Sequence, residues 1–160
     1  MALDRAWIER HIPHQGDMCL LDEVLTWNPV RVQCRSTTHR DAANPLRAHD
    51  RLAAVCGIEY AAQAMAVHGA LIASRITSST QSATVAGYLA SVRNVSLYAN
   101  RLDDIEGDLV ATAELVTGDE HTVLYDFTVS AGERTLLAGR ATIVFNAALR
   151  ELSTSPRTQE

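Results

Sequence analysis

The sequence predicts an α+β fold in which an antiparallel sheet wraps one long apolar helix. Residues 53–76 have helical spacing and are rich in Ala, Leu and Met, which favour helices. Two segments before this helix and four after it have the composition or the alternation of strands. A helix that is apolar nearly all round needs cover on several sides, and an antiparallel sheet can supply it.

The length and composition indicate one globular domain. The 160 residues are 47% hydrophobic and 21% charged, which is enough to build one core. We expect this domain to span residues 1–148 and the polar tail, residues 149–160, to be disordered. The formal net charge of -5 and the scattered positions of the 14 Lys and Arg residues argue against a nucleic-acid binder. Small molecules or proteins are therefore the expected partners.

The cysteines and the N-terminal residues favour a cytoplasmic protein. The three cysteines have no C-x-x-C spacing, and their odd number does not suggest a disulfide framework. The N-terminal segment has acidic residues and lacks the apolar core of a signal peptide. The long apolar segment is interrupted by Glu59, Gln63 and His68, which favours a core helix over insertion into a membrane.

The part of the chain before the long helix is expected to form a short helix and two strands. Residues 4–10 have amphipathic helical spacing, and a loop with a proline and a glycine follows. We expect strands over residues 18–27 and 30–38, separated by an Asn-Pro turn. Residues 41–50 contain a proline and many polar side chains, so we expect an irregular segment there.

Four further strands are expected after the long helix. Residues 85–98 are rich in β-forming side chains, residues 109–116 alternate regularly, and residues 123–130 and 136–146 complete the set, with Gly-containing turns between the last three. Two strands, one helix and four strands in this order make a segregated α+β domain. A long central helix wrapped by an antiparallel sheet of about five to six strands is the hot-dog fold.

Glu59 lies near the middle of the apolar segment and is the best clue to function. Moving an unpaired carboxylate out of water is costly, so we expect apolar surroundings to raise the pKa of Glu59. A carboxyl group that keeps its proton near neutral pH is a suitable general acid. The alternative is a structural carboxylate paired with an arginine such as Arg93 inside a dimer interface. His68 lies nine residues further on, and about 100° per residue places it on the opposite helix face.

Two motifs occur in a fixed order along the chain. The first is Ile12-Pro-His-Gln-Gly-Asp-Met-Cys-Leu-Leu-Asp-Glu-Val, and the second is Gly57-Ile-Glu-Tyr-Ala-Ala-Gln-Ala. They resemble the opening Leu-Pro-His-Arg-x-Pro-x-Leu-Leu-Val-Asp-x-Val and the central-helix Ile-Glu-Ala-x-Ala-Gln of the 3-hydroxyacyl carrier-protein dehydratases of fatty-acid and polyketide synthesis. The resemblance covers residues 5–146, and the residues of the two motifs are closest to those of the dehydratase-like proteins of aryl-polyene pathways.

This resemblance implies dehydration of 3-hydroxyacyl thioesters to trans-2-enoyl thioesters. Glu59 would be the acid, and a histidine would accept the α-proton. The family's catalytic histidine stands fourteen residues before the helix glutamate, where this chain has Pro45 beside Asn44. The remaining candidates for the base are His14, in the Pro-His loop, and His49, ten residues before Glu59.

Other residues of the helix complete the expected site. Gln63 lies one turn beyond Glu59 on the same face and is expected to bind its carboxyl group or the substrate's hydroxyl. The backbone N–H groups of residues 54–57, including Cys56 and Gly57, are expected to bind the thioester oxygen at the positive end of the helix dipole. The Cys56 side chain has no basic neighbour in sequence and is expected to be a small core residue.

The implied partners are an acyl carrier protein, whose phosphopantetheine carries the substrate, and a second hot-dog subunit, identical or not. No metal and no other cofactor are expected. Arg47, Arg51, Arg93 and Arg101 are candidates for a patch that binds the acidic carrier protein or its phosphate, with scattered solvated charges as the alternative. Two further functions stay open: a thioesterase in which the carboxylate activates water, and a non-catalytic subunit that completes the cleft of a catalytic partner.

Overall fold

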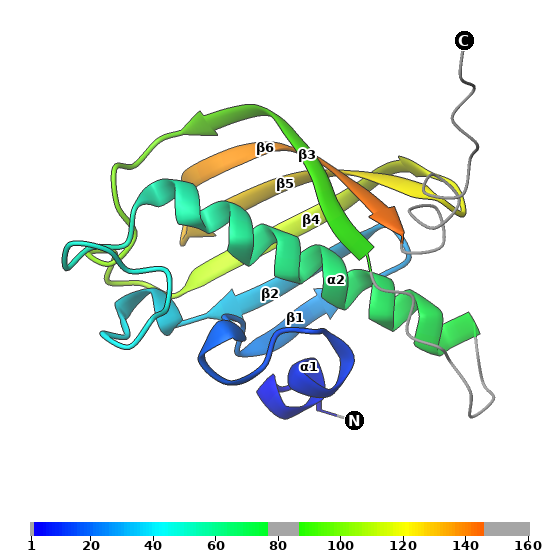
Figure 1. Ribbon diagram of the computed structural model, residues 1–160, viewed down its shortest axis with the longest axis horizontal. Helices are drawn as coiled ribbons and strands as arrows, with labels where there is room; N and C mark the ends of the chain where they lie inside the picture. The colour runs from blue at the N-terminus through cyan, green and yellow to red at the C-terminus, as the bar shows by residue number, and fades with distance from the viewer. Residues whose placement is uncertain (1, 77–86, 146–160) are drawn as a thin grey trace, which may run out of the picture.

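The computed structural model describes residues 2–76 and 87–145, which form one sheet around one long helix (Figure 1). The helices are α1 (Arg5–His11) and α2 (Gly57–Ile76), with short 3-10 turns at Gly16–Met18, Thr38–Arg40 and Ala54–Cys56. The strands are β1 (Glu23–Trp27), β2 (Arg31–Ser36), β3 (Gly87–Leu97), β4 (Leu109–Gly118), β5 (Thr122–Ala131) and β6 (Arg134–Phe145). The predicted α+β hot-dog arrangement is confirmed.

The six strands pair antiparallel in the order β1-β2-β4-β5-β6-β3, so β1 and β3 are the edges. The β1 edge is partly covered, because the Val24 N–H group donates to the Leu3 carbonyl at 2.9 Å and Asp4 forms a bridge with Glu23. Within the described part of the chain no strand pairs with the outer side of β3, which lies beyond β6 in Figure 1. β3 is therefore the open edge of the sheet.

The core lies between α2 and the face of the sheet that curves around it. The helix packs against β2, β4 and β5, and Tyr60 on the helix and Phe127 on β5 are the largest fully buried side chains. By length and composition alone this helix could also cross a membrane, but half of that segment is buried inside the protein. Its contacts with three strands are those of a core helix, as the sequence predicts.

The strand predicted over residues 18–27 begins only at Glu23. The reason is a side chain from the helix: the Leu20 N–H group donates to Gln63 Oε1 at 2.9 Å, and Gln63 Nε2 donates to the Met18 carbonyl at 2.8 Å. Backbone groups that a neighbouring strand would bind are thus bound by an amide. Gln63 therefore holds residues 18–20 to α2, and regular pairing with β2 starts later, although the Ser36 hydroxyl also donates to the Leu20 carbonyl and the Asp22 N–H group donates to the Arg35 carbonyl at 2.9 Å.

The other predicted elements agree with the structure within a few residues. Asp4, predicted as the first helical residue, is instead the N-cap of α1 and accepts a hydrogen bond from the Trp7 N–H group at 3.0 Å. The predicted helix start at Ala53 leads into a 3-10 turn, so α2 begins at Gly57. The predicted tail, residues 149–160, lies outside the described residues.

Candidate active site

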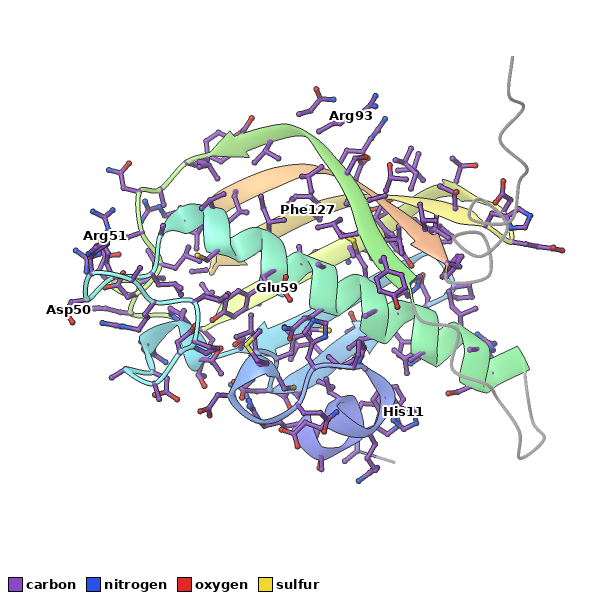
Figure 2. All side chains as sticks on the ribbon, in the orientation of Figure 1. His11, Asp50, Arg51, Glu59, Arg93 and Phe127 are labelled. Carbon is purple, nitrogen blue, oxygen red and sulfur yellow. The ribbon has the colours of Figure 1, made fainter. Side chains whose placement is uncertain are left out.

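His14 and Glu59 meet at the centre of the candidate site. The Nε2 atom of His14 lies 3.0 Å from Oε1 of Glu59, and the two side chains are 27% and 32% exposed. His14 comes from the loop between α1 and β1, and Glu59 comes from the first turn of α2, where Figure 2 labels it. The structure therefore brings together an imidazole and a carboxyl group that are 45 residues apart in sequence, and leaves both partly open.

Gln63 is fully buried and connects this loop to the helix. Its Nε2 atom donates to Glu59 Oε1 at 3.3 Å and to the Met18 carbonyl at 2.8 Å, while its Oε1 atom accepts from the Leu20 N–H group at 2.9 Å. Both N–H bonds of the amide are thus in use. Of the two roles predicted for Gln63, the structure favours binding of the Glu59 carboxyl group over binding of the substrate's hydroxyl.

The pKa of Glu59 is lowered, and the prediction of a raised pKa was wrong. The main cause is the hydrogen bond from His14, which favours the charged carboxylate; burial opposes it, and the hydrogen bond from Gln63 adds to the lowering. The sequence displays the apolar neighbours of Glu59 along the helix but not an imidazole that arrives from another segment. Glu59 is therefore a carboxylate at neutral pH.

The two ring nitrogens of His14 have different surroundings. The Nδ1 atom is buried and has no hydrogen-bond partner in the described part of the structure. The Nε2 atom faces Glu59 Oε1 at 3.0 Å, so the imidazole donates to the carboxylate through its Nε2–H group.

His49, the alternative base, lies away from this pair. It is exposed, and both His49 and Asp50 have positive φ angles, 54° and 59°. The backbones of Ala48 and Arg51 bond to each other at 2.9 and 3.1 Å, so these two residues form the tip of a two-residue turn. Figure 2 places Asp50 and Arg51 at one end of the molecule, far from Glu59. The imidazole beside the carboxylate is that of the Pro-His loop.

Asn44 stands beside the position at which the resemblance expects a catalytic histidine, and its contacts are structural. The residue is 6% exposed. Its Nδ2 atom donates to the Thr38 carbonyl at 2.9 Å and to Tyr60 Oη at 3.0 Å, and its Oδ1 atom accepts from the Leu46 N–H group at 2.9 Å. Asn44 therefore fastens its loop to α2 and supplies neither an acid nor a base to Glu59.

The backbone N–H groups expected to bind the thioester oxygen already have acceptors. The Cys56 N–H group donates to the Ala53 carbonyl at 3.0 Å, and the Gly57 N–H group donates within the preceding 3-10 turn. Burial raises the pKa of the Cys56 thiol, in agreement with a core residue and not a nucleophile. Binding of a substrate oxygen by Cys56 or Gly57 stays a prediction, and it requires these bonds to change acceptors.

The sequence raises two other residues, His68 and Arg93, as possible partners of Glu59. His68 is buried, with Nδ1 2.7 Å from Tyr125 Oη and Nε2 2.8 Å from the Asn28 carbonyl oxygen, so its exclusion as a partner of Glu59 is confirmed. Arg93 is exposed on β3, and Figure 2 places it at the sheet edge, far from Glu59. Within residues 2–76 and 87–145 of one chain, Glu59 pairs with His14 and not with Arg93, and a Glu59–Arg93 pair across a dimer interface stays a prediction.

The four candidate arginines for a carrier-binding patch are divided in space. Arg47 donates to the Asp50 carbonyl at 3.0 Å, which keeps it beside the two-residue turn that Arg51 follows. Arg101 forms a bridge with the segment just before α2 and pairs with an aspartate two residues on. Arg93 stands apart on β3. Arg47, Arg51 and Arg101 can therefore form one patch close to the start of α2, and Arg93 cannot join it.

A cavity of about 220 Å³ lies near the candidate site, with Arg5, three aspartates, two threonines, Asn44 and an alanine as its lining. Neither His14 nor Glu59 lines this cavity. Among residues 2–76 and 87–145, no group of three or more His, Cys, Asp or Glu side chains is placed to hold a metal ion. The chemistry that this geometry supports is therefore proton transfer by the His14–Glu59 pair.

Comparisons with known proteins agree with this fold. Residues 6–154 match the family described as ApeP-like, ApeP dehydratase. A chain of the dehydratase heterocomplex ApeI:P from Xenorhabdus doucetiae is 24% identical, with a TM-score of 0.77 over 92% of this chain and 97% of that chain. A thioesterase family protein from Silicibacter pomeroyi is 19% identical, with a TM-score of 0.60 over 88% and 97%. The search of curated proteins gave no significant match.

Proposed function

We propose a dehydratase activity for this chain, which belongs to the ApeP dehydratase family. In this proposal it removes water from 3-hydroxyacyl thioesters on acyl carrier protein and forms trans-2-enoyl thioesters. The reaction serves aryl-polyene assembly, a branch of fatty-acid and polyketide chemistry. The observation that carries the proposal is the 3.0 Å contact between His14 Nε2 and Glu59 Oε1. Both side chains are partly exposed, so a bound acyl chain can reach the pair. The phosphopantetheine of the carrier would present that chain.

Glu59 acts as the base in this proposal. Its lowered pKa keeps it ionised at neutral pH, so the carboxylate is ready to accept the α-proton of the thioester. The His14 N–H group stabilises the carboxylate, and Gln63 fixes its orientation from the other side. This reverses the roles expected from the sequence, in which His14 accepts the proton and Glu59 donates one.

One carboxyl group can serve both halves of the elimination, because the reaction neither gains nor loses protons. The α C–H bond breaks, its proton moves to Glu59, and its electron pair forms the new C=C double bond while the β C–O bond breaks. Protonated Glu59 then gives the proton to the departing hydroxyl, which leaves as water. The proton balance closes within the His14–Glu59 pair.

A second hot-dog subunit completes the site in this proposal. A relative of this chain occurs in the ApeI:P heterocomplex, and the open β3 edge here carries exposed apolar side chains at Tyr88, Leu89, Val95 and Leu97. Exposed edge strands with apolar side chains favour pairing with another strand. The described cavity does not include His14 or Glu59, so we expect the partner to supply one wall of the acyl-binding cleft.

The acyl carrier protein binds, in this proposal, beside the start of α2. Arg47, Arg51 and Arg101 lie around the loop that precedes this helix. Their guanidinium groups suit an acidic carrier surface or the phosphate of phosphopantetheine. Arg51 is exposed, whereas Arg101 is already paired with Asp103, so we expect Arg51 to contribute most.

Two other functions have one observation each in their favour. A non-catalytic role inside a heterodimer is favoured by Asn44, which holds its loop in place beside the position where related dehydratases carry their histidine. A thioesterase is favoured by the ionised state of Glu59, because a carboxylate can activate water as a general base. Release of free thiol without enoyl formation would identify the thioesterase.

The proposal is tested by incubating the chain, alone and with a hot-dog partner subunit, with a 3-hydroxyacyl carrier-protein thioester and following enoyl absorbance. We expect Glu59→Gln to lower kcat about 100-fold or more. His14→Asn should also lower it, whereas the matched change His49→Asn, at an exposed turn, should not. If Glu59→Gln turns over like the wild type in the mixture, the chain is a non-catalytic subunit.

A further inference from the structure

A row of charged side chains crosses five of the six strands. From β2 through β4, β5 and β6 to β3, the residues that lie directly opposite one another are Arg31, Glu114, Asp126, Arg140 and Arg93. Residues directly opposite in an antiparallel pair point to the same face, with Cβ atoms about 4.5–5.5 Å apart. The row lies on the outer face, because Tyr125 and Phe127, the neighbours of Asp126 along β5, are buried.

Arg93, the last residue of this row, has no compensating charge among residues 2–76 and 87–145. The nearest carboxylate in the row, Asp126, is bound by Arg140, with Nε 2.8 Å from Oδ1. The ion pairs formed within residues 2–76 and 87–145 include none to Arg93. Figure 2 places Arg93 at the edge of the sheet. The row therefore ends in two adjacent positive charges at the open edge.

The edge strand contains no carboxylate of its own. β3 reads Gly87-Tyr-Leu-Ala-Ser-Val-Arg-Asn-Val-Ser-Leu97, and Arg93 is its one charged residue. A second copy that pairs through β3 cannot place a carboxylate of that strand opposite Arg93, whatever the register. The edge strand of a different protein can do so.

We infer that Arg93 selects a non-identical partner subunit whose edge strand carries an aspartate or glutamate opposite it. The inference rests on the proposed pairing of β3 with a second hot-dog subunit and adds the residue that decides which subunit is accepted. A facing carboxylate pairs with the Arg93 guanidinium and extends the row, whereas a like charge directly opposite is destabilising. Discrimination of this kind combines attraction to one partner with repulsion of another.

Sedimentation velocity and native mass spectrometry of mixed copies test the inference. The probe is a second full-length copy that carries one glutamate on the outer face of β3. The residues of β3 that lie on the same face as Arg140, according to the pairing with β6, are Tyr88, Ser91, Arg93 and Ser96. The four variants are therefore Tyr88→Glu, Ser91→Glu, Arg93→Glu and Ser96→Glu. Each copy is mixed with the wild type. We expect one of the four to form a mixed dimer whose Kd is about two- to fivefold lower than that of the wild-type homodimer. High salt should abolish the difference.

Arg93→Gln and Arg31→Gln are matched variants, because each removes one arginine from an end of the same row. We expect Arg93→Gln to strengthen self-association about two- to fivefold and Arg31→Gln to leave it unchanged. The inference is overturned if no glutamate-bearing copy binds the wild type more tightly than the wild type binds itself, or if the two glutamine variants self-associate alike. The enoyl assay of Arg93→Gln, which leaves the His14–Glu59 pair intact, reports separately on the proposed function.

Discussion

Replacement of Gln63 by leucine measures how much one buried amide contributes to the site. The change leaves the Leu20 N–H group, now bound at 2.9 Å in the interior, without an acceptor, and such a loss costs about 1–3 kcal/mol. The Met18 carbonyl can turn to water, because that residue is 41% exposed. We therefore expect the free energy of unfolding to fall by about 1–3 kcal/mol and Tm to fall by roughly 3–10 °C.

Thermal and urea unfolding followed by circular dichroism give this number, with Gln33→Leu as the matched control. On the outer face of the sheet, Gln33 Nε2 donates to Thr112 Oγ1 at 3.2 Å, and Gln33 Oε1 accepts a long hydrogen bond from Thr26 Oγ1 at 3.4 Å. Solvent can replace these partners, so the loss should cost less than about 1 kcal/mol. Gln63→Leu should also loosen Glu59 and lower the rate of enoyl formation. Equal stability of Gln63→Leu and wild type would refute the reasoning, because the amide would then not hold the loop.

Two further predictions concern α2. Gly57→Ala should lower the free energy of unfolding by about 1–3 kcal/mol, because its Cβ atom would collide with the Leu137 side chain. Gly69→Ala meets nothing within 4 Å and should raise the free energy of unfolding by about 0.5–1 kcal/mol. A urea titration in which Gly57→Ala is more stable than the wild type would contradict the first expectation. Burial lowers the pKa of His68, so its contribution to the unfolding free energy should be complete above about pH 6.5 and decline as the pH falls toward the lower folded pKa. His68→Gln should flatten that decline; an unchanged pH slope in urea titrations would show that another group causes it.

Periodicity and motif spacing predicted the parts of the fold that depend on local sequence. The helix over residues 53–76 and the strands after it follow from the spacing of apolar side chains, and the structure places them within a few residues. The start of β1 at Glu23 was missed, because Gln63 binds the backbone of Met18 and Leu20 from a distant helix. No pattern within residues 18–27 indicates that contact.

The sequence predicted which two residues form the candidate site, but it did not predict that the Glu59 carboxyl group is ionised. Motif resemblance put His14 and Glu59 forward, and the fold brings them to 3.0 Å. The direction of the pKa shift depends on that distance, since a hydrogen bond to the charged form outweighs burial. The same limit applies to Arg93, whose row of neighbours exists only once the strand registers are known.

The pKa of the Glu59 carboxyl group, followed by site-specific carbon NMR in the wild type and in His14→Asn, tests the central claim most directly. The account predicts a midpoint below the ordinary glutamate value of 4.5 in the wild type and a higher midpoint when the imidazole is removed. A wild-type midpoint above 4.5, or one that does not move in His14→Asn, would contradict it, because the carboxylate would then not be held as a base by its neighbour.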